Sequence, residues 1–197
     1  MTTETTPAGY TYDNPDLPAS PVGRERLNEL LTDVMWTEDD APALRRAGEI
    51  LSPRVSDILD VWYDFIGSTP HLVSVFRGAD GEPDAEYLDR VRGRFERWVI
   101  DVCTREFDDQ WLAYQEEIGL RHHTTKKNQT DNVDSPASHV PMSDMMALVV
   151  PVTLSVRSFL EEGAQEGDDV DAMHQAWFKA VTVTLVLWSR PYAGDLW

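Results

Sequence analysis

The sequence is poor in cysteine, in lysine and in long apolar runs, and each scarcity excludes a class of protein. The single cysteine, Cys103, rules out an internal disulfide framework and a Cys-x-x-Cys metal site. No apolar run approaches the roughly eighteen residues that cross a membrane. The start, Met-Thr-Thr-Glu, lacks the basic and apolar regions of a secretory signal. We therefore expect a cytoplasmic protein.

Positive charge is also scarce. The chain has 35 acidic against 17 basic residues, a net charge of -18, and only three of the bases are lysines. Such a balance argues against binding to nucleic acid and to anionic membranes. An acidic, lysine-poor surface suits a protein kept soluble in concentrated salt, where ions screen its self-repulsion. An ordinary acidic protein from a GC-rich genome, which favours Arg over Lys, is the other interpretation.

Common catalytic signatures are missing. The chain contains no Gly-x-Gly-x-x-Gly, no P-loop, no His-Glu-x-x-His and no Gly-x-Ser-x-Gly. The histidines lack the i,i+4 spacing of a helical zinc site, so such a site would need ligands from distant segments. They are His71, His122, His123, His139 and His174.

What is present is helical periodicity over nearly the whole chain, without an alternating strand pattern. We predict an all-α fold in one domain, residues 23–197, preceded by an extended, proline-containing arm at 1–22. Ser52 and Pro53 look like the cap and first residue of a helix. Pro151 should kink or break the apolar helix 143–161, which we expect at the centre, and Pro191 should follow the last helix. The other helices are expected over 24–35, 37–51, 53–66, 84–103, about 109–123 and 170–189.

The adjacent histidines His122 and His123 end one of these helices. At about 100° per residue, His122 lies within about 40° of Trp111 and Ile118, on the apolar side. His123 is in phase with Glu116 and a more solvated face. One histidine therefore projects into the interior. Taken alone, this pattern favours a core histidine bonded to a backbone carbonyl, which is the commoner case.

Four aromatic residues on other predicted helices could surround that histidine. Together they would form a pocket for a flat macrocycle, with His122 as its metal ligand. Ordinary core packing is the alternative for each, above all for Trp98. The residues are Trp62, Tyr63, Phe95 and Trp98.

Several longer motifs give the chain a family resemblance. Glu117-Ile-Gly-Leu-Arg-His-His123, continued by Thr125-Lys-Lys-Asn-Gln-Thr-Asp-Asn-Val133, resembles the signature of the protoglobins, single-domain haem proteins of the globin superfamily. The resemblance implies a globin fold with an additional N-terminal helix, Arg24 to about Met35, and an arm that helps bury haem b. Further matching motifs are Trp62-Tyr-Asp-Phe-Ile-Gly-Ser68, His71-Leu72, Arg94-Phe-Glu-Arg-Trp98, Gln175-Ala-Trp-Phe-Lys-Ala180 and Gly9-Tyr-Thr-Tyr12.

The resemblance also implies site residues. His122 matches the proximal iron ligand, in agreement with the periodicity. Trp62, Tyr63 and Phe95 match the distal pocket, and Leu148 falls where the family has a fourth aromatic. Arg94 is a candidate partner for a haem propionate, or a solvated arginine on a helix flank.

The implied function is reversible binding of O₂, CO or NO at a five-coordinate haem iron, as a gas carrier or sensor. Sensing would use a separate signalling partner. The alternative is a haem enzyme that acts as a peroxidase, nitrite reductase or NO dioxygenase. The resemblance also implies a homodimer through the last two helices. The alternative is that both helices are completely buried against the haem.

Overall fold

The computed structural model describes residues 6–194 and 197, and this part of the chain is helical, as expected. An isolated bridge between Arg77 and Pro83 is its one β-type pairing. The α-helices are α1 (Arg24–Asp33), α2 (Asp40–Leu51), α3 (Val55–Gly67), α4 (Pro70–Val73), α5 (Ala85–Thr104), α6 (Asp109–His122), α7 (Met142–Gly163) and α8 (Val170–Ala193), with 3₁₀ turns η1 (Ser52–Arg54) and η2 (Ser74–Phe76).

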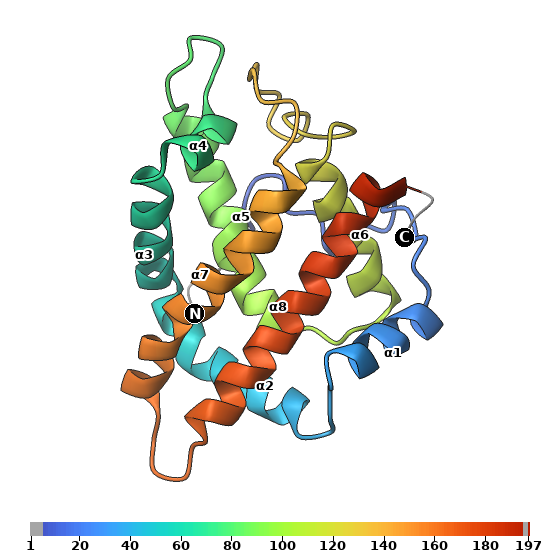
Figure 1. The fold of residues 1–197 in the computed structure, drawn as a ribbon, viewed down its shortest axis with the longest axis vertical. Coiled ribbons are helices and arrows are strands. Elements are labelled where there is room, and N and C mark those ends of the chain that lie inside the picture. Colours follow the sequence, from blue (N-terminus) through green and yellow to red (C-terminus); the bar gives the residue numbers. More distant parts are fainter. Residues whose placement is uncertain (1–5, 195–196) are drawn as a thin grey trace.

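Helix α8 organises the fold. It packs along α7, and also against α2 and α6. In Figure 1, α7 and α8 cross the middle of the molecule, with α3 and α4 on one side and α1 and α6 on the other. The central residues Val156, Trp177 and Ala180 are fully buried, so the two longest helices form the inner layer of the main core.

Aspartate caps set the starts of three helices. Asp84, Asp108 and Asp169 each accept a hydrogen bond from the backbone N–H three residues on, at 2.9, 2.8 and 2.9 Å. The cap at Asp108 fixes the start of α6. Because α6 then runs for four turns without interruption, His122 falls in its last turn.

Proline affects the helices less than the sequence indicates. Ser52 and Pro53 do not start α3: they form η1, Ser52 makes no capping bond, and α3 begins at Val55. Helix α7 runs unbroken across Pro151, and α8 continues past Pro191 to Ala193. Neighbouring helices can hold a helix together across a proline, at the cost of one backbone hydrogen bond.

The prediction that the apolar helix lies at the centre is only half right. One face of α7 is buried through Val156 and Leu160, but Met146, Val150 and Leu154 are 49%, 58% and 62% exposed. By length and composition alone α7 could cross a membrane, although only 33% of its most apolar window is buried. Core helices of soluble proteins pass the same test, and the three residues, spaced i, i+4 and i+8, form an apolar stripe on the surface.

The N-terminal segment, residues 6–22, contains no helix and is docked on α5 and α6; the first five residues of the predicted arm lie outside the described residues. Tyr12 is 3% exposed, and the rings of Tyr10 and Tyr12 each meet Tyr114 edge-on at 5.3 Å. The Tyr10 hydroxyl donates to Asp101 at 2.6 Å. The two tyrosines therefore fix the N-terminal segment to the body of the protein.

Candidate functional site

A cavity of about 260 Å³ lies between the helices, and its lining is largely apolar. Helices α3 to α8 all contribute to its wall, together with η2 and the loop after α6. The structure brings all the predicted site residues to this one cavity. They are His122, Trp62, Tyr63, Phe95, Arg94 and Leu148, and Trp98 joins them.

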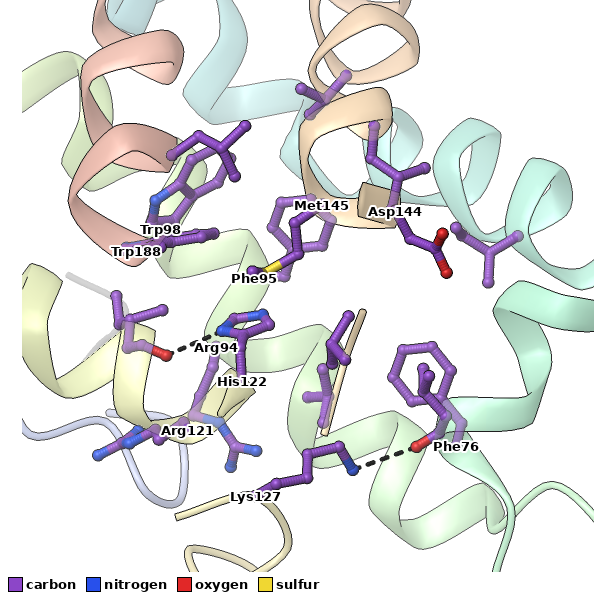
Figure 2. A pocket seen from close by; sticks show the side chains of 18 of the residues that line it. Phe76, Arg94, Phe95, Trp98, Arg121, His122, Lys127, Asp144, Met145 and Trp188 are labelled. Carbon is purple, nitrogen blue, oxygen red and sulfur yellow. Dashed lines mark hydrogen bonds between the residues drawn. The ribbon is translucent and has the colours of Figure 1, made fainter. Parts of the chain in front are cut away.

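His122 is held by its own helix and by α8. Its Nδ1 donates to the carbonyl of Ile118, one turn back, at 2.8 Å, and its ring stacks on Trp188 with centroids 5.1 Å apart (Figure 2). Burial lowers the pKa of His122, so the ring is neutral. With Nδ1 protonated, Nε2 carries the lone pair, and among the described residues Nε2 has no hydrogen-bond partner. This geometry presents a metal-binding nitrogen to the cavity.

The position of Trp188 depends on the close approach of α6 and α8. A Cβ at Gly119 would lie 3.1 Å from the Trp188 Cα and 3.2 Å from its carbonyl oxygen, so a side chain there would push the helices apart. The Trp188 indole N–H donates to Gln115 at 2.9 Å, which orients the ring. Helix packing, in addition to the i−4 hydrogen bond, thus fixes the plane of the His122 ring.

Aromatic residues form another part of the cavity wall. Trp62 and Phe95 meet edge to face, with centroids 5.5 Å apart. Burial raises the pKa of Tyr63 well above its usual value, so its hydroxyl keeps its proton and can donate. In the described part of the chain, that hydroxyl makes no hydrogen bond to protein. Leu148, which was predicted at the position of a further aromatic residue, also lines the cavity.

Positive charge is concentrated at the cavity. Four bases line it and only two acids, Asp131 and Asp144, although acids outnumber bases two to one in the chain. Arg94 is already engaged: it makes two bonds to Asp131, at 2.9 and 2.6 Å, and one to the Ala8 carbonyl at 2.8 Å. The bases are Arg94, Arg121, Lys126 and Lys127.

Trp188 and Lys127 are among the cavity residues that were not singled out as site residues from the sequence. Trp188 contacts His122 from another helix, 66 positions along the chain, and no local sequence pattern predicts that contact. Lys127 belongs to the signature motif, but only its burial, at 7% exposed, shows that it points inwards. The scarcity of lysine is the signal in the sequence that could have pointed to Lys127, since two of the three lysines line the cavity.

These residues fit a haem. An apolar cavity with aromatic walls suits a flat macrocycle, a neutral imidazole nitrogen suits its iron, and buried positive charge suits its carboxylates. Among the described residues no cluster of three or more His, Cys, Asp or Glu could hold a bare metal ion.

A helical fold around an apolar cavity with one inward, neutral histidine defines a globin-type haem pocket. The protoglobin family model matches residues 24–197, nearly the whole chain, and the chain belongs to this family. It is thus a haem-binding, gas-binding globin. No curated protein sequence matches the chain.

Proposed function

We propose that the protein binds diatomic gases reversibly at the iron of haem b, with His122 as the axial ligand through Nε2. The observation that supports this proposal is the state of His122: neutral, oriented by Ile118 and Trp188, and with a free lone pair on the cavity side. The Nδ1–H bond to a carbonyl increases the donor strength of Nε2. When bound, haem supplies an iron whose sixth position is open to O₂, CO or NO.

The absorption spectrum of the purified protein, reduced and with or without CO, tests this function. We expect a Soret band that shifts on addition of CO, because a five-coordinate ferrous haem has room for the gas. A protein that takes up no haem when haem is supplied during expression would contradict the proposal. A spectrum that CO leaves unchanged would contradict the open sixth position.

Tyr63 is the hydrogen-bond donor that we assign to the gas-binding side of the cavity. Its hydroxyl holds its proton and has no protein acceptor among the described residues, and O₂ accepts a hydrogen bond better than CO does. Replacing Tyr63 with Phe should speed O₂ release about tenfold, which corresponds to the loss of one such bond. Stopped-flow dissociation measures this, with CO release as the control. An O₂ rate that does not change would show that Tyr63 is not the donor.

The proposed assembly is a homodimer through α7 and α8 in the cytoplasm. The apolar stripe of Met146, Val150 and Leu154 supports it, because an exposed stripe of this kind is typical of an interface. Sedimentation should give the mass of a dimer, and a Leu154→Glu variant should sediment as a monomer. A monomeric wild-type protein would argue against this assembly.

We propose a role as gas carrier or sensor, the latter with a separate partner.

A further inference from the structure

Lys127 differs from the other bases of the cavity. Arg94 pairs with Asp131 at 2.6 Å, and Arg121 and Lys126 both pair with Glu117, at 3.0 and 2.6 Å. Among the described residues, no carboxylate lies within salt-bridge distance of Lys127. Figure 2 shows its side chain extending along the floor of the cavity, away from Arg121.

The partners of Lys127 are all neutral. Its Nζ donates to the Val75 carbonyl at 3.2 Å, to the Tyr87 hydroxyl at 2.9 Å and to the Asn128 side-chain oxygen. They come from three segments, η2, α5 and the loop, so the folded chain holds the ammonium in place. Its orientation does not depend on a ligand.

A buried charge with only neutral partners is costly. Burial lowers the pKa of Lys127 to about 8, and Asp131 opposes this shift only through space, because Arg94 already holds its carboxylate. An anion that enters the cavity would neutralise the charge and explain why it is there.

We propose that Lys127 is a carboxylate-binding residue of the cavity, which anchors one propionate of the cofactor and selects carboxylated over neutral macrocycles. This inference rests on the proposed function. Arg94 was the predicted propionate partner, but its charge is already paired with the Asp131 carboxylate. The three Nζ hydrogens are in use, so the carboxylate replaces one acceptor. Asn128 lies in the same loop as Lys127 and can yield without a helix moving.

The test uses metal-free mesoporphyrin IX and its dimethyl ester, which differ only in the two carboxylates. Fluorescence titration gives the ratio of their affinities in each protein, and this ratio cancels any general effect of a variant on folding. In Lys127→Met the preference for the diacid should fall about tenfold, because one charge-assisted hydrogen bond is lost. Lys126→Met is the matched control, since Lys126 lines the same cavity but is paired with Glu117; its ratio should stay close to the wild-type value.

The wild-type protein provides a second readout through pH. A protonated Lys127 binds the carboxylate, so binding raises its pKa, and the diacid preference should be full below about pH 8 and decline above it. The groups that act on Lys127 are Tyr87 on α5, which accepts its hydrogen bond, Asp131 in the loop and His122 on α6; η2 contributes the Val75 carbonyl. Of these, Tyr87 has a pKa of about 12 and that of His122 is lowered.

The outcomes separate the two proposals. An unchanged diacid preference in Lys127→Met, or a wild-type preference that stays flat from pH 7 to 10, would overturn the role of Lys127 and leave gas binding intact. A wild-type protein that binds mesoporphyrin with this preference but shows no Soret response to CO would overturn the gas-binding proposal instead. A tenfold loss in Lys126→Met as well would also overturn the inference, because it would show a diffuse charge effect.

Discussion

Replacing His122 with glycine is expected to abolish the Soret band of the reduced, five-coordinate protein and to weaken haem retention by at least tenfold. His122 is the histidine that lines the cavity, and its Nε2 is the nitrogen free to bind iron. Loss of the ring also leaves a space beside Trp188 that has the shape of an imidazole. Free imidazole added in excess should therefore enter that space and restore a CO-sensitive Soret band. Absorption spectra of His122→Gly with and without imidazole measure both effects.

The rescue separates ligation from folding. A variant that lost haem only because α6 had unfolded would not recover with imidazole, whereas one that lost only its ligand would. His123→Gly is the matched control, because it removes the neighbouring histidine, which contacts Thr125 and Tyr192 and does not line the cavity. An unchanged spectrum in His122→Gly would disprove the assignment of the iron ligand.

The sequence predicts the part of the site that depends on helical period. His122 shares a helix face with Trp111 and Ile118, and both the inward direction and the i−4 carbonyl partner follow from 3.6 residues per turn. The all-α fold and most helix limits follow from the same signal. The helical period is a local property, so tertiary packing does not change it.

The remainder depends on contacts between distant segments. Lys127 lies in a loop, where no period applies, and it contacts Val75 and Tyr87, 52 and 40 positions away. The stack of Trp188 on His122 depends on the close approach at Gly119. Helix α7 shows a further limit of prediction from sequence. Its apolar residues are equally compatible with a central helix and with a helix exposed on one face, and only the packing shows that Leu154 is exposed. The roles of the cavity residues towards haem stay predictions.

Replacing Gly9 with alanine is expected to speed haem loss by about tenfold. Gly9 has φ of +77°, and a Cβ there would lie 2.7 Å from the Thr130 Cγ2 and 2.9 Å from the Arg94 Nη1. Arg121 donates to the Gly9 carbonyl at 2.7 Å. Arg94, Arg121 and Thr130 also line the cavity, so the N-terminal segment packs against the cavity wall at this point. The left-handed conformation alone costs alanine about 1–2 kcal/mol, which displacement of the segment would relieve.

Transfer of haem to an excess of apomyoglobin measures the rate of loss, and Gly81→Ala provides the control. Gly81 has nearly the same φ, +82°, but a Cβ there would meet no atom within 4 Å, in a loop away from the cavity. It therefore carries the backbone strain without the contact to Arg94 and Thr130. If the segment retains haem, only Gly9→Ala should lose it faster. Equal rates in both variants and the wild type would mean that haem escapes by a route that the N-terminal segment does not close.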